Sequence, residues 1–266
     1  MMPPWTLALS STLVGLAVLL AAIAISLDAE ASAWPHRIAL KSTSSDNPNS
    51  TVQYVESVVS SRDANRKAER PRHLVIFFHG IGARGTQMGG LGGSWKSTLP
   101  NTVFASPDAP FPTRSGGRQW FAVDNDVMRP ERIAAARRAF DDLVSEIVER
   151  QGFENDLKNV AFVAVSQGAI MALDGVASGR WKIGALVSFA GILPLPPTSS
   201  SRATPILLMH GGADRTIPPA AAAAASRQLN AAGFDVTYKL FPEVGHTISA
   251  EEAKEAADFL RGRFSR

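Results

Sequence analysis

Short apolar runs alternate with longer helical segments along most of the chain, and this alternation restricts the fold more than any other feature. An apolar run without a polar face predicts a strand buried on both sides, as in a parallel sheet. The predicted strands are His73–His79, Thr102–Ala105, Val160–Val165, Ile183–Phe189, Pro205–Met209 and Val236–Phe241. The predicted helices are Glu131–Gln151, Gln167–Ala177, Pro219–Ala232 and Ala250–Arg263. The pattern indicates an α/β fold in which helices cover both faces of a mostly parallel sheet.

Two further segments precede this pattern. The segments His36–Lys41 and Thr51–Ser60 are rich in β-branched residues and are separated by turn-forming residues at 44–49. They predict an antiparallel hairpin at the edge of the sheet. The chain has 266 residues, a length that a single α/β domain often reaches. We therefore expect one domain from residue 34 to residue 266.

The N-terminus carries an apolar leader. Residues from Trp5 to Leu27 are almost all apolar, and the stretch ends near Ala31-Ser32-Ala33, a pattern that signal peptidase cuts. The leader predicts export, with residues 1–33 removed as a signal peptide after cleavage near Ala33. Two alternatives stay open. The stretch is long enough to remain as a membrane anchor, which the absence of Lys and Arg before Arg37 favours, or it is a buried core helix.

Composition excludes several kinds of function. The chain has no cysteine, which excludes disulfides, thiolate catalysis and cysteine-ligated zinc. The formal net charge of +3 comes mostly from scattered basic residues. The densest basic cluster, residues 62–72, is diluted by Asp63 and Glu69 and contains no aromatic residue. We interpret it as a solvated loop rather than a surface for nucleic acid or an anionic membrane, so no nucleic-acid partner is expected.

Ser166 lies in Ala164-Val165-Ser166-Gln167-Gly168, directly after a predicted strand and directly before a predicted helix. This is the position of a nucleophile elbow, where a sharp turn lifts the serine hydroxyl clear of the sheet. Ala164 stands where the usual motif has glycine. The five residues alone are a weak signal, and the alternative is that Ser166 only caps the helix.

A serine hydroxyl needs a base, and the base needs an acid that orients it. Asp214 follows the predicted strand Pro205–Met209, and His246 follows the last predicted strand. Sites in open α/β sheets lie at these carboxyl ends of strands. The order Ser, Asp, His is the one used by α/β-hydrolases. The sequence therefore predicts a triad of Ser166, Asp214 and His246.

Other candidates for the two partners fit less well. Asp124 and Asp126 precede Ser166 and break the required order, and a loop residue such as Asp214 is often only a turn former. The other four histidines lie close to the start or end of predicted strands, where packing or backbone hydrogen bonds explain them: His36, His73, His79 and His210.

Acyl transfer also requires donors for the oxyanion of the tetrahedral intermediate. We expect one at the backbone amide of Gln167, where the helix begins, and the other at the amide of Ile81, in the loop after the first parallel strand. Glycines follow from Gly82 to Gly93, but no G-x-x-x-x-G-K-[ST] motif is present, so nucleotide binding is not indicated. We expect this stretch to form a flexible rim of the site.

Taken together, these motifs resemble the phospholipase/carboxylesterase family of α/β-hydrolases, which includes acyl-protein thioesterases and bacterial carboxylesterases. The resemblance extends from about His73 to Leu260. The segments that carry it are Phe78–Gly82, Ser106–Pro110, Gln119–Phe121, Ser166–Ala169, His210–Asp214 with Ile217–Pro218, and Gly245–His246. The chain departs from the family at Ala164, at Ala122, where many members have an acidic residue, and in its apolar leader.

The resemblance implies the same triad and the same two oxyanion amides. It also implies that Trp120 and the Leu193-Pro194 region border an acyl pocket, and that no cofactor or metal is needed. The expected function is hydrolysis of a small-molecule carboxylic ester with an apolar acyl group, through an acyl-enzyme. Lysophospholipids and thioesters are alternative substrates. Transfer of the acyl group to an alcohol or amine, and a non-catalytic ligand-binding domain of the same fold, are alternative functions. Residues 5–27 are the expected membrane contact, and the sequence leaves the oligomeric state open.

Overall fold

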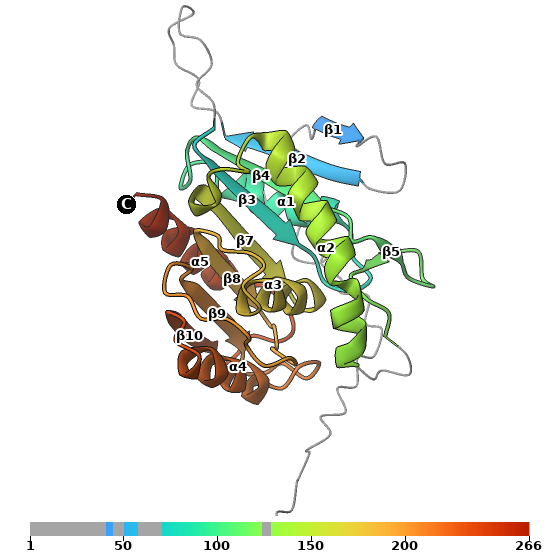
Figure 1. The fold of residues 1–266 in the computed structure, drawn as a ribbon, viewed down its shortest axis with the longest axis vertical. Coiled ribbons are helices and arrows are strands. Elements are labelled where there is room, and N and C mark those ends of the chain that lie inside the picture. Colours follow the sequence, from blue (N-terminus) through green and yellow to red (C-terminus); the bar gives the residue numbers. More distant parts are fainter. Residues whose placement is uncertain (1–40, 45–50, 58–70, 124–128, 266) are drawn as a thin grey trace, which may run out of the picture.

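A computed structural model describes residues 41–44, 51–57, 71–123 and 129–265 (Figure 1). The apolar leader, the basic residues 62–70 and the two alternative acids Asp124 and Asp126 lie outside the described residues. Within the described ranges, no helix is both long enough and apolar enough to cross a membrane.

The centre of the molecule is one eight-stranded sheet in the order β1-β2-β4-β3-β7-β8-β9-β10. Its strands are β1 (Lys41–Ser44), β2 (Thr51–Ser57), β3 (His73–Phe78), β4 (Thr102–Pro107), β7 (Val160–Val165), β8 (Ala185–Phe189), β9 (Ile206–Gly211) and β10 (Val236–Phe241). Six neighbouring strands of this sheet pair in parallel, as the apolar runs predict: β4, β3, β7, β8, β9 and β10. The chain moves from β3 outward to β4 and then crosses back to β7. The strand order therefore reverses beside β3, a point where open sheets form their sites.

The predicted N-terminal hairpin is present, with different bounds. β1 pairs antiparallel with β2, and β2 pairs antiparallel with β4, so the hairpin forms the edge of the sheet. Within the described residues β1 begins at Lys41, where the sequence predicts a strand end, and it includes Ser44, which the sequence assigns to the turn. Residues 36–40 of the predicted first strand lie outside the described residues.

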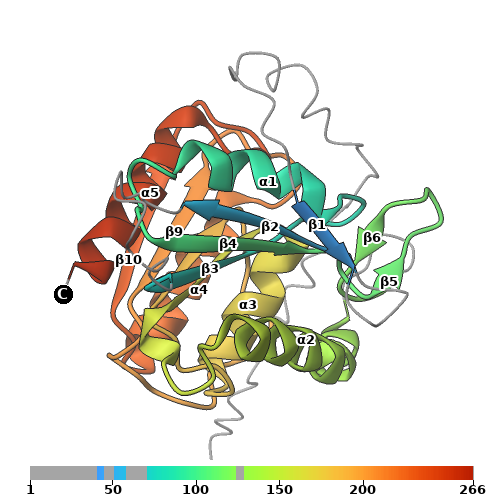
Figure 2. The same ribbon diagram turned by 90° about the horizontal axis from the view of Figure 1, so that it is seen from above.

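Helices cover both faces of the sheet (Figure 2). The bounds are α1 (Gly85–Ser94), α2 (Pro130–Gln151), α3 (Gln167–Ala177), α4 (Pro219–Ala231) and α5 (Ala250–Phe264). Apolar residues of α1 and α5 pack on one face, and those of α2, α3 and α4 pack on the other. Ser249 caps α5 through a capping box with Glu252, which satisfies amides that a helix start leaves unpaired. The four predicted helices are confirmed within a residue or two.

The sequence prediction was wrong for one helix, α1. We expected the glycine-rich stretch after Gly82 to be a flexible rim, but Gly85–Ser94 is helical. A Cβ on Gly92 would lie 3.0 Å from Cβ of Phe104 and 3.1 Å from the Phe77 ring. Glycine therefore allows close packing of the helix on the sheet, and this packing outweighs the low helix propensity of glycine.

A small two-stranded hairpin was also not predicted. β5 (Phe111–Pro112) and β6 (Arg118–Gln119) pair antiparallel beside the main sheet. The Gly82 amide donates to the Arg118 carbonyl, and the Arg118 amide donates to the Ala83 carbonyl. The hairpin thus fixes the backbone of the loop that follows β3.

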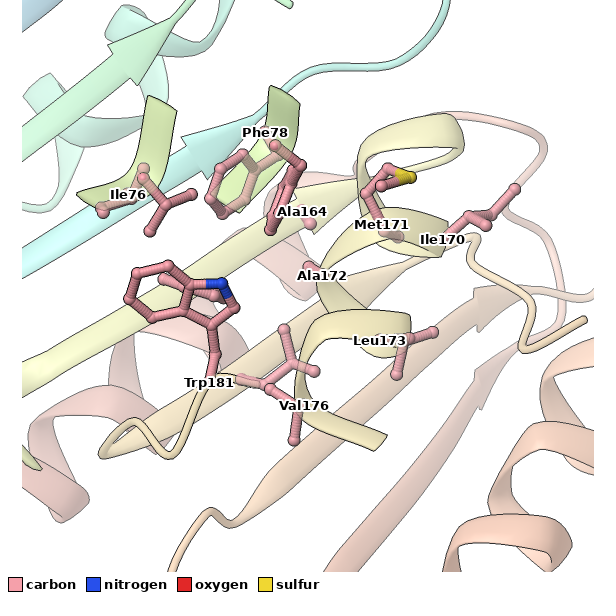
Figure 3. Packing of buried hydrophobic residues seen from close by; sticks show 14 of the residues in the cluster. Ile76, Phe78, Ala164, Ile170, Met171, Ala172, Leu173, Val176 and Trp181 are labelled. Carbon is pink, nitrogen blue, oxygen red and sulfur yellow. The ribbon is translucent and has the colours of Figure 1, made fainter. Parts of the chain in front are cut away.

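α3 lies at the centre of the larger core, and every one of its residues is buried. Its apolar side chains pack over Phe78 of β3 and Ala164 of β7 (Figure 3). Phe78 meets Phe162 edge-on at 5.0 Å between ring centroids and Trp120 edge-on at 5.4 Å. Edge-on aromatic pairs contribute about 0.5–1.5 kcal/mol each beyond the burial of their area. The N-terminus of α3, where Ser166 lies, is therefore built on a rigid support.

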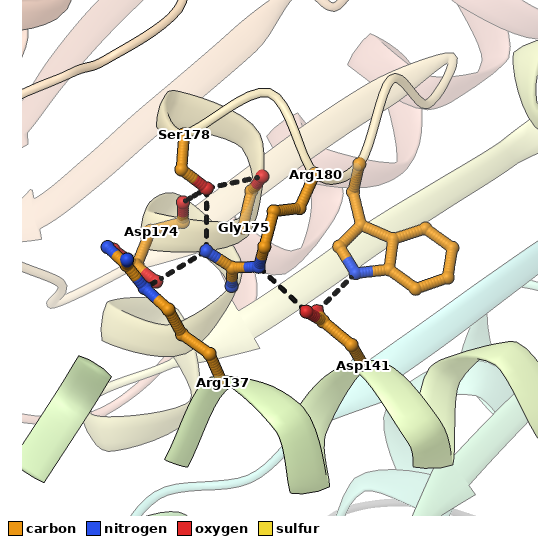
Figure 4. Close-up of polar contacts among 7 residues, drawn as sticks. Arg137, Asp141, Asp174, Gly175, Ser178 and Arg180 are labelled. Carbon is orange, nitrogen blue, oxygen red and sulfur yellow. Dashed lines mark hydrogen bonds and ion pairs between the residues drawn. The ribbon is translucent and has the colours of Figure 1, made fainter. Parts of the chain in front are cut away.

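Charged side chains tie α2 to α3 on the outer side of this core (Figure 4). Asp174 of α3 accepts two hydrogen bonds from Arg137 of α2, 2.9 and 2.7 Å long, and one of 3.0 Å from Arg180. Arg180 also donates to Asp141 of α2, which accepts a further hydrogen bond from the indole of Trp181. We call Arg137, Asp141, Asp174 and Arg180 the helix cluster.

Candidate active site

Ser166 occupies a strained turn between β7 and α3. Its φ of 53° and ψ of −119° lie outside the regions that L-residues normally adopt. The turn is held by hydrogen bonds from the Ser166 amide to Phe189 O and from the Ile170 amide to Ser166 O. Ser166 stands at the N-cap position, but its side chain makes no capping hydrogen bond. The hydroxyl is therefore free of the structural role that was the alternative interpretation.

Close packing at this turn requires glycine two residues after the serine. A Cβ on Gly168 would collide with the Phe78 and His79 carbonyl oxygens of the neighbouring chain segment. Ala164, where the usual motif has glycine, is fully buried and pairs with Phe78 on one side and Ser188 on the other. The methyl group of Ala164 is accommodated in the core, so this departure leaves the turn intact.

The structure brings Ser166, His246 and Asp214 together from three separate loops. Nε2 of His246 lies 3.0 Å from Oγ of Ser166, and Nδ1 of His246 lies 2.8 Å from Oδ2 of Asp214. Because a carboxylate only accepts hydrogen bonds, Nδ1 carries the proton, and the free Nε2 lone pair faces the serine hydroxyl. Ser166 is 2 % exposed, and the His246 side chain is 12 % exposed.

The loops that carry Asp214 and His246 are bonded to each other. The Gly212 amide donates to the Phe241 carbonyl, and the Ala213 amide donates to the Val244 carbonyl. Since β9 and β10 are neighbours in the sheet, these bonds continue the strand pairing into the loops. The separation between the Asp214 and His246 side chains is thus set by backbone contacts as well as by their own hydrogen bond.

The electrostatics around Asp214 favour its ionised form. Burial alone would raise the pKa of Asp214, but hydrogen bonds from His210, His246 and the Ile217 amide outweigh burial and hold the pKa well below its usual range. Oδ1 of Asp214 also accepts from the Thr216 amide, at 2.8 Å. Asp214 therefore both forms a turn, as one interpretation held, and stays negatively charged opposite His246.

Two backbone amides beside Ser166 make no bond to a backbone carbonyl among the described residues: those of Ile81 and Gln167. The Gly80–Ile81 peptide is oriented by His79. The Ala109 amide donates to Nε2 of His79 at 2.9 Å, so Nδ1 carries the proton and donates to the Gly80 carbonyl at 2.7 Å. A planar trans peptide then points the Ile81 N–H to the opposite side. Burial lowers the pKa of His79, which keeps this ring neutral.

The side chain of Gln167 has a role that the sequence did not reveal. Its Oε1 accepts from the Trp120 amide at 2.7 Å, and its Nε2 donates to the Phe121 carbonyl at 2.8 Å. The Trp120 indole donates to the His79 carbonyl at 2.8 Å. Trp120 is 1 % exposed, so it lies in the core behind the loop that follows β3 rather than on an open surface. Leu193, in the loop after β8, is 5 % exposed.

His210 is a second site residue that the sequence did not single out. It lies at the end of β9, is fully buried, and bonds a backbone carbonyl as expected. It also reaches Asp214, with Nε2 3.2 Å from Oδ2. Its place directly before glycine at a strand end was the available signal, but it did not distinguish packing from contact with the triad.

Neither a metal site nor a cavity elsewhere in the described residues offers an alternative to the site at Ser166. No group of three or more His, Asp or Glu side chains in the described ranges is arranged to hold a metal ion. A cavity of about 620 Å³ is lined by Pro71–His73 and by residues near the end of α2. It lies at the amino end of β3, whereas Ser166 follows the carboxyl end of the neighbouring β7, so the cavity and Ser166 lie at opposite ends of the strands.

The fold, with a serine, a histidine and an aspartate meeting at the carboxyl ends of its strands, defines the α/β-hydrolase class. The chain matches the Phospholipase/Carboxylesterase family over residues 60–263 and belongs to that family. It is therefore a hydrolase of the ester-cleaving class.

Relatives and solved structures agree with this assignment. The chain is 32 % identical over 193 residues to esterase YpfH of Escherichia coli, covering 71 % of this chain and 82 % of the relative. It is 26 % identical over 211 residues to acyl-protein thioesterase 1 of Gibberella zeae, covering 70 % and 88 %. The crystal structure of esterase PE8 superposes with a TM-score of 0.68 at 26 % identity, covering 79 % of this chain and 96 % of that one.

Proposed function

We propose that this protein hydrolyses carboxylic esters through an acyl-enzyme, with Ser166 as nucleophile, His246 as general base and Asp214 as the acid that orients the base. The observation that carries the proposal is the continuous pair of hydrogen bonds from Ser166 through His246 to Asp214, 3.0 and 2.8 Å long. The strained backbone at Ser166 supports it, because a buried serine with only a structural role has no need of such a turn.

The first half of the reaction acylates Ser166. Nε2 of His246 takes the hydroxyl proton while Oγ attacks the ester carbonyl carbon, and the carbonyl electrons move onto oxygen. The amides of Ile81 and Gln167 stabilise that oxyanion, a contribution of about 10²–10³ in rate for each donor. Collapse of the intermediate breaks the ester C–O bond, and the leaving alcohol takes the proton from His246.

The second half releases the acid. Water gives a proton to His246 and attacks the acyl carbon. The second oxyanion collapses by breaking the bond between the acyl carbon and Oγ, and His246 returns the proton to Oγ as the carboxylic acid is released. Asp214 stays ionised throughout and stabilises the imidazolium form of His246. An alcohol or amine in place of water would turn hydrolysis into acyl transfer.

We propose an apolar acyl group for the substrate, with Ile81, Trp120 and Leu193 closest to it. A carboxylic ester is the main candidate, and thioesters and lysophospholipids are alternatives, since acyl-protein thioesterases are among the relatives. Rates on p-nitrophenyl esters of increasing acyl length, compared with a thioester of the same acyl group, decide between ester and thioester. Product analysis with added alcohol measures acyl transfer.

Replacement of the nucleophile tests the proposal. We expect Ser166→Ala to lower kcat/KM by about 10⁴-fold or more and to abolish covalent labelling by a fluorophosphonate. Ser188→Ala is the matched control, because Ser188 is equally buried on the next strand and pairs with Ala164, and it should keep both labelling and activity. A folded Ser166→Ala protein with unchanged activity would overturn the proposal.

For the leader, we propose export with cleavage near Ala33, which leaves a single domain from residue 34 to residue 266. Anchoring through residues 5–27 is the alternative. N-terminal sequencing of the mature protein distinguishes the two, since a mature chain that begins after Ala33 supports export and an intact leader supports anchoring.

A further inference from the structure

Asp214 has two histidine partners, and the proposed reaction uses only one of them. His246 and His210 both approach Oδ2 of Asp214, His246 through Nδ1 at 2.8 Å and His210 through Nε2 at 3.2 Å. His210 is fully buried on β9, and the Asp214 side chain is also 0 % exposed. One ring from β9 and one ring from the loop after β10 thus meet one oxygen of a buried carboxylate.

The contacts of His210 define its tautomer. Nε2 faces two acceptors, the Ile217 carbonyl at 2.8 Å and Oδ2 of Asp214 at 3.2 Å. A carbonyl and a carboxylate cannot donate, so Nε2 carries the proton. Nδ1 is buried and has no hydrogen-bond partner in the described part of the chain. His210 is therefore a donor toward Asp214 and has no route by which to serve as a base for Ser166.

The turn from Asp214 to Ile217 is held both by the Asp214 carboxylate and by the His210 ring. Oδ1 of Asp214 holds the amides of Thr216 and Ile217, at 2.8 and 2.9 Å. His210 holds the carbonyl of the same Ile217. Without the ring, Oδ2 keeps His246 as its one side-chain donor, and the turn loses the bond that ties Ile217 to β9.

We propose that His210 is a positioning residue of the proposed reaction, which fixes the Asp214 carboxylate so that Oδ2 points at His246. The inference rests on the proposed function. The charged groups around the ring are Asp214 on its own loop, His246 on the loop after β10 and Glu252 on α5, which interacts with His210 electrostatically. Of these, only Asp214 lies within ion-pair distance of the ring, with its Oδ2 3.2 Å from Nε2.

Two amide variants separate the hydrogen bond from the volume of the ring. His210→Gln can place an N–H where Nε2 lies, whereas His210→Asn can reach only the position of Nδ1, and His210→Leu removes the donor. We expect Leu and Asn to lower kcat by about 10²-fold with little change in KM, since a small displacement of a catalytic group has that effect. We expect Gln to restore most of kcat.

The control is His73→Gln. His73 is also a histidine whose buried Nδ1 has no partner in the described residues, but it lies at the amino end of β3, and its replacement should leave kcat unchanged. Equal kcat for Gln and Asn, or a Leu variant as active as the wild type, would overturn the inference. If Ser166→Ala is inactive and these His210 variants keep full activity, the inference alone fails and the proposed function stands.

A measurement on the unaltered protein covers the case in which His210 variants do not fold. Nitrogen-15 NMR of the ring should show a proton on Nε2, and that proton should exchange slowly. An Nε2 without a proton would contradict the inference, because the ring could then donate nothing to Asp214.

Discussion

Asp214 at the candidate active site and Asp174 in the helix cluster are both buried carboxylates, yet their partners differ in kind. Asp214 accepts from two histidine rings and two backbone amides. Asp174 accepts from two guanidinium groups, those of Arg137 and Arg180. An arginine keeps its charge under all ordinary conditions, whereas a histidine can gain or lose a proton.

This difference suits the contacts of Asp214 to the proposed reaction and the helix cluster to the packing of α2 against α3. In the proposed reaction His246 takes a proton from Ser166, so the Asp214 site would gain a positive charge for the lifetime of the intermediate, and the carboxylate would stabilise that charge. The helix cluster has two cations and two carboxylates, so its charges already balance. We expect substitutions at Asp214 to change the rate of reaction, and substitutions at Asp174 to change the stability of the fold.

The largest effect is expected for Asp214→Asn. The amide can still accept from the Thr216 amide, but it stabilises the wrong tautomer of His246, so kcat should fall by about 10⁴-fold. Steady-state kinetics on a p-nitrophenyl ester measures the loss, and near-ultraviolet circular dichroism checks the fold. A folded variant within tenfold of the wild-type kcat would remove Asp214 from the proposed mechanism.

The next effect is expected for Asp174→Asn. Loss of the carboxylate charge leaves Arg137 and Arg180 without their shared anion, and breaking such a pair costs about 3 kcal/mol of unfolding free energy. Urea unfolding measures this loss, and kcat should change little. Lys254→Ala is the control, since solvent screens the exposed Lys254–Asp258 pair and its loss should change the unfolding free energy little. Equal losses of unfolding free energy for Asp174→Asn and Lys254→Ala would contradict a stabilising role for the helix cluster.

The smallest effect is expected in the acid dependence of stability. The pKa of Asp214 is depressed in the folded protein, so its contribution to stability is present above the unfolded value of about 3.9 and is lost as pH falls further. The stability gap between wild type and Asp214→Asn should therefore narrow as pH is lowered from about 5 to about 3. Urea unfolding at several pH values measures this difference in unfolding free energy. A difference that grows as the pH falls would contradict the ionised state of Asp214 in the folded protein.

The sequence predicts most of the sheet because its parallel strands are buried on both sides. β7 and β10 have the predicted bounds, and the other parallel strands differ by two residues or fewer. α1 was missed because propensity assigns glycine to loops, while the close approach to Phe104 and Phe77 is a tertiary effect. The β5–β6 hairpin was missed because its two-residue strands are too short to show a pattern.

Candidate site residues were predictable where they follow a strand. Ser166, Asp214 and His246 each do so, and the structure brings them within hydrogen-bond distance. The contacts of Gln167 with Trp120 and of His79 with Ala109 join residues 47 and 30 positions apart. No local spacing encodes such contacts, so the sequence did not reveal how Trp120 and His79 are held.

The link between the loop that follows β3, residues 80–84, and the β5–β6 hairpin has a consequence for engineering. Gly82 and Ala83 are bonded to Arg118, and a Cβ on Gly117 would collide with the carbonyl of Gly82. A loop exchange with a relative that replaces residues 80–84 alone would pair a foreign backbone with the native hairpin. The two segments are one exchangeable module, and libraries that aim at new acyl specificity should transplant 80–84 and 111–119 together.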